Sequence, residues 1–217
     1  MPPRNHQNSG PTTADTPCRY EGSLSLIVGS MFSGKSTELL HRINSFLSIG
    51  KQILVINHTF NVRSDEEGKQ GITTHDCLQH HSIGYTSSHT DCITLTTLAD
   101  LFTTPAYASL VEHASVICIE ELQFFTDTKE SVLQLINEHS KKVIAAGLIA
   151  DYEGNLFGDV GALIPYADDV HHSKALCSVC NDGTPGIFTQ RISPHCDQIA
   201  VGEKDMYRAV CRKHYYS

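Results

Sequence analysis

The segment Gly29–Ser36, GSMFSGKS, has the spacing of a phosphate-binding loop. Two glycines and a following Lys-Ser pair match the pattern G-x4-G-K-[ST], in which backbone N–H groups and a lysine surround phosphate groups. The apolar run Ser23–Gly29 leads into this loop and predicts a buried strand. The apolar spacing over Lys35–Leu47 predicts a helix directly after it. A phosphate-binding loop between a strand and a helix indicates an α/β fold.

Further apolar segments continue the alternation of strand and helix. Buried strands are expected at Gln52–His58, Ser115–Leu122 and Lys142–Ile149. Helices are expected at Leu95–Ala114, interrupted or kinked by Pro105, and at Lys129–Ser140. Residues 60–91 are polar and predict a solvated loop with at most a weak hairpin. This order predicts a P-loop NTPase-like parallel sheet flanked by helices.

The charge balance bears on the kind of partner. The chain carries 16 Lys and Arg against 24 Asp and Glu, a net charge of −8, and it has no run of basic residues. Proteins that bind nucleic acid usually show the opposite balance, so such a partner is disfavoured. A phosphorylated small molecule remains compatible, because backbone amides hold phosphate without net positive charge.

Composition also suggests a location and a domain plan. No stretch reaches the roughly 18 apolar residues of a membrane span, and the first residues lack the apolar segment of a secretory signal. We therefore expect a cytoplasmic protein with no membrane partner. Residues 1–20 are rich in Pro, Ser, Thr and Asn and predict a disordered tail. Residues 21–168 would form the nucleotide-binding α/β domain, and 169–217, with short β-like pieces around Cys and His, a small second domain.

Two successive acids, Glu120 and Glu121, end the third expected strand. An acid at this place can hold Mg²⁺ through water, together with the Ser36 hydroxyl of the loop. The second acid can act as a base on an attacking hydroxyl. As an isolated pair these acids would more often be a solvated strand end, but the preceding phosphate loop favours the catalytic interpretation.

Two pairs of metal-ligating residues stand near the end of the chain. Cys177-x2-Cys180 and Cys211-x2-His214 together offer the four ligands that tetrahedral Zn²⁺ prefers. His195 or Cys196 could replace a ligand, although this is the less favoured set, and unrelated cysteines are the alternative. A closed four-ligand site supports folding and leaves no open position for catalysis.

These motifs resemble the thymidine kinases of the cellular, bacterial and poxviral type, which have a zinc-containing lasso domain. The resemblance rests on GSMFSGKSTELL, Arg63, Thr74–Asp76 (THD), EELQFF, Leu156–Gly158 (LFG) and the final CRKH, and extends over roughly residues 23–215. It implies transfer of the ATP γ-phosphate to the 5′-hydroxyl of thymidine with Mg²⁺, giving dTMP for DNA precursor salvage. Deoxyuridine stays open as a second acceptor, and the family is usually homotetrameric.

The resemblance also assigns roles, with Glu121 as the catalytic base. ATP would contact Gly29, Ser30, Met31, Phe32, Ser33, Gly34, Lys35, Ser36, Asn61, Val62, Arg63, Glu120 and Gln123, and Mg²⁺ would be held by Ser36 and Glu120. The nucleoside would contact Phe124, Tyr152, Gln198, Ile199, Ala200, Val201, Gly202 and Tyr207, in a lasso that a structural zinc on Cys177, Cys180, Cys211 and His214 ties down.

Three departures from the family pattern motivate a competing hypothesis. Asn61 and Ile149 stand where the family has aspartate, and Glu120 stands where the family has the shorter acid. A non-catalytic nucleotide-binding homologue with a regulatory role is therefore the alternative. An ATPase whose zinc unit grips nucleic acid is a third reading, which the net charge disfavours.

Overall fold

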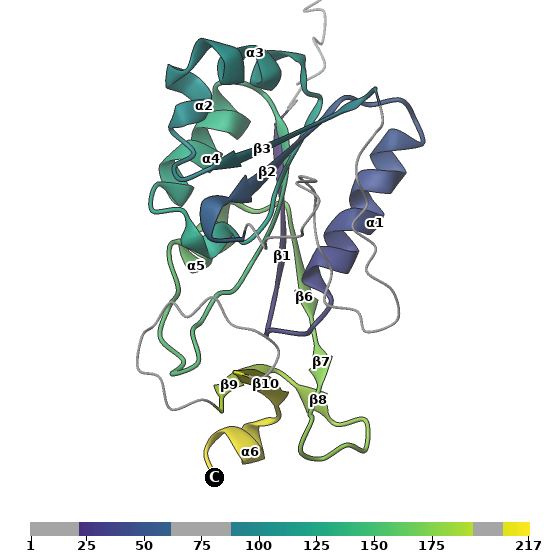
Figure 1. Ribbon diagram of the computed structural model, residues 1–217, viewed down its shortest axis with the longest axis vertical. Coiled ribbons are helices and arrows are strands. Elements are labelled where there is room, and N and C mark those ends of the chain that lie inside the picture. The colour runs from purple at the N-terminus through teal and green to yellow at the C-terminus, as the bar shows by residue number, and fades with distance from the viewer. Residues whose placement is uncertain (1–21, 62–87, 193–205) are drawn as a thin grey trace, which may run out of the picture.

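The computed structural model describes residues 22–61, 88–192 and 206–217 and contains a six-stranded parallel sheet (Figure 1). The strand order is β3-β2-β4-β5-β1-β6. The strands are β1 (Ser23–Gly29), β2 (Ile53–His58), β3 (Thr90–Leu95), β4 (Val116–Ile119), β5 (Lys142–Gly147) and β6 (Asp169–Ser173). Every neighbouring pair is parallel. The predicted α/β sheet is confirmed, and all four strands expected from apolar runs lie in it.

Helices cover both faces of this sheet, as Figure 1 shows. Helix α1 (Lys35–Leu47) packs on one face. The opposite face carries α2 (Asp100–Thr103), α3 (Pro105–His113), α4 (Thr128–Asn137) and α5 (Val160–Leu163). Short 3-10 turns cover Thr59–Asn61 (η1), Leu122–Phe124 (η2) and Ile164–Tyr166 (η3). None of the helices in the described ranges has the length and apolar character to cross a membrane.

Strand β2 shows why its sequence reads as a continuous apolar run. Leu54 and Ile56 pack into the larger core beneath α2–α5, whereas Ile53 and Val55 pack into the smaller core beneath α1. Successive side chains of a strand point to opposite faces, and here both faces are covered by helices. The strand is therefore apolar at every position that the two cores reach.

Two segments near α2 differ from the sequence-based expectation. Strand β3 begins at Thr90, inside the range predicted as loop, and ends at Leu95, where a helix was predicted to begin. As the edge strand beside β2 it is only partly buried, so its polar and β-branched residues do not form an apolar run. Pro105 divides the expected helix, because it occupies the first turn of α3 after the extended Thr104.

The predicted second domain, residues 169–217, includes β6, yet the residues of β6 pair with β1 in the main sheet. Its polar sequence, DVHHS, hid this role, because an edge strand exposed along most of its length needs no apolar run. The division of the chain into domains remains a prediction. The residues of β6 itself extend the sheet.

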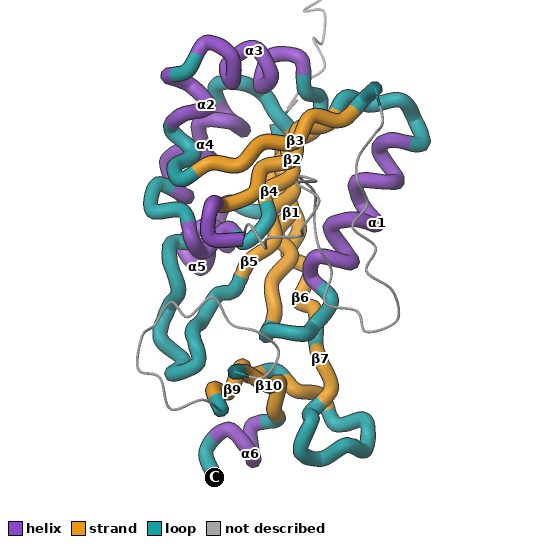
Figure 2. The backbone as a smooth tube through the Cα atoms, in the orientation of Figure 1, coloured by secondary structure: helices purple, strands orange, loops and turns teal. Residues whose placement is uncertain are grey.

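The C-terminal unit, which we define as residues 174–192 and 206–217, consists of two short antiparallel pairs and a final turn of helix (Figure 2). Strand β7 (Ala175–Leu176) pairs with β8 (Pro185–Gly186), and β9 (Phe188–Arg191) pairs with β10 (Tyr207–Val210). Helix α6 (Arg212–Tyr215) follows. The expected β-rich character is thus observed. The predicted tail at 1–20 and most of the predicted loop lie outside the described residues.

Candidate active site and metal-ligand cluster

The glycine-rich loop follows β1, and the acid pair follows β4, so both lie at the carboxyl end of the parallel sheet. The Ser36 hydroxyl donates a 2.5 Å hydrogen bond to the Glu120 carboxylate, whose residue is 3% exposed. Oxygen donors of this kind suit Mg²⁺. Two residues that are 84 positions apart in the sequence therefore converge on one point, as a phosphate-bound magnesium ion would require.

The side chain of Lys35 extends back across the glycine-rich loop that precedes it. Its ammonium group donates a 3.0 Å hydrogen bond to the carbonyl of Ser30. Burial lowers the pKa of Lys35, and the charges of Glu121 and Glu120 act in the opposite direction. The three charged groups are therefore close enough for the two acids to influence the Lys35 ammonium. Gly34, in a left-handed conformation, leads directly into α1, whose positive end faces the loop.

Glu121 has an uncommon backbone conformation for a side-chain-bearing residue, with φ 52° and ψ 47°. Its carboxylate accepts a 2.7 Å hydrogen bond from the side-chain amide of Gln123. The side-chain carbonyl oxygen of Gln123 in turn accepts a 2.9 Å hydrogen bond from the backbone N–H of Leu148, directly after β5. Strained conformations of this kind concentrate at functional sites, where surrounding contacts hold them.

Gly158, the glycine of the LFG segment, packs against this arrangement. Its φ of +56° is unfavourable for other residues, and a Cβ atom there would lie 2.6 Å from the backbone carbonyl oxygen of Gln123. The glycine therefore allows residues 156–158 to lie directly on η2. Phe157 of the same segment meets the ring of Phe124 edge-on at 5.7 Å.

Phe124 belongs to a ring cluster at the end of β2. The His58 ring lies 5.6 Å from Phe124 and 4.7 Å from each of Phe60 and Phe125. The Nδ1 atom of His58 accepts a 3.0 Å hydrogen bond from the backbone N–H of Phe60. Burial lowers the pKa of His58, opposed by a hydrogen bond with the backbone of Thr96. A neutral imidazole thus packs as part of an apolar wall.

Tyr152 and Tyr207, both predicted to contact a nucleoside, lie together in a second aromatic group. Their ring centroids are 6.4 Å apart, and the Arg191 guanidinium lies 4.9 Å from the Tyr152 ring and 5.6 Å from that of Tyr207. The Tyr215 hydroxyl donates a 2.9 Å hydrogen bond to the Tyr152 carbonyl. The group joins the segment after β5 to the C-terminal unit. A cation held against two rings gains roughly 0.5–2 kcal/mol per contact.

The four expected zinc ligands lie together. Their ligand atoms are all within 4.8 Å of one another. The Cys180 and Cys211 sulfurs are 3.7 Å apart, and His214 Nδ1 lies 3.4–3.6 Å from the three sulfurs. Tetrahedral zinc with ordinary bond lengths needs roughly 3.8 Å between sulfurs and roughly 3.5 Å between sulfur and nitrogen. The cluster therefore has the dimensions of a zinc site.

Two of the cysteine ligands differ in acidity. Burial, followed by hydrogen bonds with Cys177 and Cys211, raises the pKa of Cys180 to about 11. Burial alone would raise the pKa of Cys177, but hydrogen bonds from backbone N–H groups, that of Cys180 first, and from His214 lower the pKa to about 5. The thiolate is the form that binds zinc. The cluster thus favours the ionised sulfur at one ligand without any ion present.

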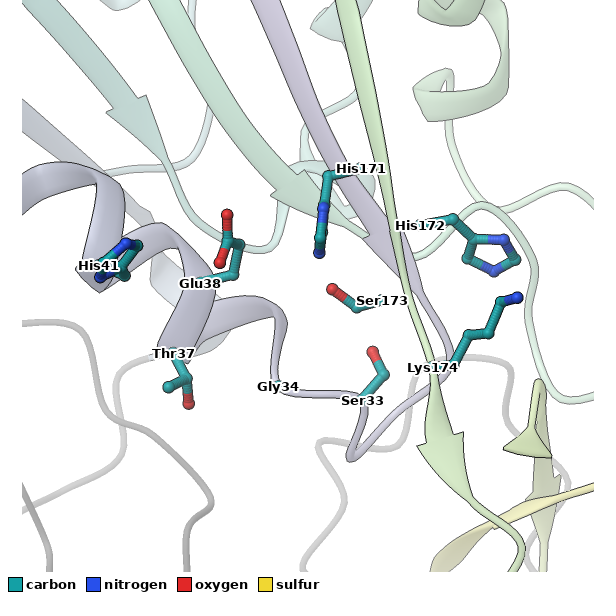
Figure 3. A pocket seen from close by; sticks show the side chains of 9 residues that line it. All are labelled: Ser33, Gly34, Thr37, Glu38, His41, His171, His172, Ser173 and Lys174. Atoms are coloured by element: carbon teal, nitrogen blue, oxygen red, sulfur yellow. The ribbon is translucent and has the colours of Figure 1, made fainter. Parts of the chain in front are cut away.

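An open pocket of about 700 Å³ lies beside the loop (Figure 3). The loop and α1 contribute Ser33, Gly34, Thr37 and Glu38, and the edge strand β6 contributes His171 and His172. No motif in the sequence predicts a role for these histidines. They reach this pocket because β6 pairs beside β1, which its polar sequence did not predict.

Apart from the four metal ligands, the predicted site residues that the structure describes form three groups. Gly29–Gly34 form the loop itself, where Lys35, Ser36, Glu120, Glu121 and Gln123 also gather; Phe124 lies in the ring cluster; Tyr152 and Tyr207 lie around Arg191. Asn61 ends η1. The remaining predicted residues, Val62, Arg63, Gln198, Ile199, Ala200, Val201 and Gly202, lie outside the described residues. Sequence reasoning missed His58 and Arg191, and only their places at the ends of strand-like segments could have pointed to them.

The amino-acid sequence is similar to those of thymidine kinases from plants, viruses and archaea. A family model described as thymidine kinase matches residues 22–215. Thymidine kinase a of Arabidopsis thaliana is 36% identical over 210 residues, which cover 95% of this chain and 80% of the plant protein. The thymidine kinase of Fowlpox virus is 33% identical over 196 residues, covering 90% and 98%. That of Pyrobaculum aerophilum is 31% identical over 206 residues, covering 88% and 97%. The chain belongs to the thymidine kinase family.

Proposed function

We propose that this protein transfers the γ-phosphoryl group of ATP to the 5′-hydroxyl of thymidine. The observation that carries the proposal is the convergence of Ser36 with Glu120 beside Lys35 and Glu121 at the end of the sheet. Family membership supports the thymidine kinase assignment, because the plant and poxviral relatives compared above are thymidine kinases. Deoxyuridine is a second acceptor to be tested.

The residues of the loop would act on the donor. Backbone N–H groups of the loop and the Lys35 ammonium would bind the β- and γ-phosphates. Lys35 would then exchange its hydrogen bond with the Ser30 carbonyl for one with phosphate oxygen. Ser36 and Glu120 would hold Mg²⁺, which when bound neutralises charge on the phosphates. The open pocket beside Ser33 and Gly34 has room for a further part of the donor nucleotide.

Glu121 would act on the acceptor. Its carboxylate would take the proton of the 5′-hydroxyl as the oxygen attacks the γ-phosphorus and the bond to the ADP oxygen breaks. Gln123 would keep the carboxylate oriented through its hydrogen bond. Phe124, Tyr152 and Tyr207 would line the nucleoside side, with the backbone of residues 198–202 contacting the base. The zinc cluster would pin the segment that carries Tyr207.

The decisive experiment is a substrate panel. Purified protein with Mg²⁺ should convert thymidine to dTMP when ATP is supplied, and parallel reactions with other nucleosides and with GTP would define the acceptor and donor ranges. If neither thymidine nor any deoxynucleoside is phosphorylated, the proposal is wrong. Tight nucleotide binding without transfer at any Mg²⁺ concentration would instead support the non-catalytic alternative.

Assembly and location rest on the resemblance and on charge. We propose a homotetramer that works in the cytoplasm and does not bind nucleic acid, as the net charge of −8 favours. Sedimentation equilibrium would measure the assembly, and a monomer at micromolar concentration would contradict it. ATP hydrolysis stimulated by DNA or RNA would contradict the absence of a nucleic-acid partner.

A further inference from the structure

Two contacts join the phosphate loop directly to the C-terminal unit. The Ser30 hydroxyl donates a 2.8 Å hydrogen bond to the carbonyl of Gly186 in β8. The backbone N–H of Met31 donates a 3.0 Å hydrogen bond to the hydroxyl of Thr189 in β9. Ser30 is 6% exposed and Thr189 is 7% exposed. The first hydrogen bond is therefore buried, and the second is partly buried. Two successive loop residues are therefore held by two different strands of this unit.

Strand register connects these contacts to the metal ligands. Gly186 pairs with Ala175, which lies two residues before the ligand Cys177. Thr189 pairs with Ala209, which lies two residues before the ligand Cys211. The backbone N–H of Ser178 donates a 3.0 Å hydrogen bond to the carbonyl of Ala209, so the two strand pairs are also joined to each other. Each residue that contacts the loop is therefore paired with a strand that leads, two residues later, into one pair of zinc ligands.

Close backbone packing reinforces the connection. A Cβ atom at Gly29 would overlap the carbonyl of Ser173, at the end of β6, and one at Gly186 would lie 2.9 Å from the carbonyl of Leu176. The loop therefore begins directly against the backbone of β6, and β8 lies directly against β7, so the two hydrogen bonds join segments that are each closely packed. Displacement of β8 or β9 would shift Ser30 and Met31 with them.

We propose that the zinc-tied unit positions the donor loop, with Thr189 as the positioning residue and the Gly186 carbonyl as its second support. This inference deepens the proposed function, on which it rests, because zinc would then organise ATP binding as well as the nucleoside side. Thr189 contacts the loop and no reacting atom. Loss of its hydroxyl leaves the Met31 N–H without its partner and loosens the segment before Lys35.

Nucleotide binding is the measurement that tests it, because it needs no turnover. The chain has no tryptophan, so a fluorescent ADP analogue with Mg²⁺ reports binding directly. Thr189→Val keeps the β-branched shape and should weaken ADP binding about five- to tenfold, an order of magnitude typical of one lost hydrogen bond with a buried partner. Thr189→Ser should restore it. Ser30→Ala, made on the loop side, should weaken it without altering the C-terminal unit.

Ser178→Ala is the matched control, because it removes a hydroxyl that donates 3.1 Å to Ala209 within the unit and does not contact the loop. It should bind ADP as the unaltered protein does. Zinc content measured on every variant should be equal, so that weaker binding reports the contact and not metal loss. In steady state, Thr189→Val should raise the KM for ATP more than the KM for thymidine.

Three results would overturn the inference: normal ADP binding by both Thr189→Val and Ser30→Ala, an equal loss in Ser178→Ala, or a change confined to the KM for thymidine. Metal removal by a chelator adds a second reading, with retained far-ultraviolet circular dichroism as the check that the sheet persists. Folded, metal-free protein should bind ADP more weakly, and unchanged binding would also overturn it. A protein that binds ADP in this pattern but phosphorylates no nucleoside would refute the proposed function and leave this inference standing.

Discussion

The side-chain amide of Gln123 holds the carboxylate of Glu121 at 2.7 Å while its carbonyl oxygen accepts the N–H of Leu148. One buried side chain thereby ties the acid after β4 to the end of the neighbouring strand β5. The carboxylate is oriented by a contact that does not depend on any ligand. Such preorganisation lets a base act without first being reordered.

Replacement of Gln123 by leucine should lower kcat about tenfold and change the substrate KM values less. The leucine keeps the volume but removes the amide that orients the Glu121 carboxylate, and a loss of orientation is felt mainly in the reacting complex. Steady-state kinetics with thymidine and ATP measure the effect. Gln52→Leu, at an exposed position before β2, is the matched control. An unaltered kcat in Gln123→Leu would show that the contact has no part in catalysis.

Glu121→Gln should lower turnover by at least about a hundredfold while ADP binding stays within about twofold. General-base catalysis typically contributes factors of this size, and the amide that replaces the carboxylate cannot take a proton. Single-turnover measurements and nucleotide titration separate the two effects. Glu138→Gln, an exposed acid beyond α4, serves as the control. Loss of turnover and ADP binding together would count against Glu121 as the base.

Glu120→Gln should raise the Mg²⁺ concentration needed for half-maximal activity by about tenfold. The amide can still accept the hydrogen bond from Ser36, so the geometry persists while the charge that attracts the cation is lost. Rates measured over a range of free Mg²⁺ reveal the shift. A fall in the maximal rate with no change in Mg²⁺ dependence would assign Glu120 to a different task.

Metal analysis should find about one Zn²⁺ per chain, because the four ligand atoms form one closed tetrahedral set. Cys211→Ser should remove the metal and lower the thermal midpoint, since metal binding is coupled to folding of a small unit. Inductively coupled plasma mass spectrometry and differential scanning calorimetry give the two values. Gently purified protein that carries no zinc would remove the metal site and the pinning argument together.

His58 should make the folded state less stable as the pH falls. Burial lowers the pKa of this histidine in the folded protein, so below the ordinary pKa of about 6.5 the unfolded chain binds a proton that the folded chain resists. The penalty grows from that pH down to the folded-state pKa. His58→Phe should therefore lose less stability than the unaltered protein between pH 7.5 and pH 5.5. Urea unfolding midpoints at the two pH values measure the difference, and equal losses would contradict the prediction.

Local patterns were sufficient for much of the fold and for the chemistry of the loop. The strands β1, β2, β4 and β5 are buried on both faces, so each appears as an apolar run. Cys177 with Cys180, and Cys211 with His214, are close in sequence because one turn brings each pair to one ion. Signals of this kind are contained in a few neighbouring residues and need no knowledge of the rest of the chain.

The edge strands and the contacts between distant segments could not be read in this way. Strand β3 is only partly buried and β6 is exposed along most of its length, so no apolar run marks them. The contact between Ser30 and Gly186 joins residues 156 positions apart, and neither residue type indicates which residue it will contact. The contacts of Arg191 could not be predicted for the same reason, because the fold alone brings the rings of Tyr152 and Tyr207 to its guanidinium. Pairings between remote segments depend on topology, which a single sequence expresses only through its strand order.

The position of β1 between β5 and β6 has a consequence for the synthesis of the chain. Residues 23–29 are synthesised well before the strands that flank them, which begin at Lys142 on one side and Asp169 on the other. The phosphate loop is therefore translated long before either neighbour exists, and its frame closes only after more than a hundred further residues. A nascent chain would expose an unsupported glycine-rich segment throughout that interval, so the ability to capture nucleotide arises late in synthesis, when the whole sheet is already available to receive it.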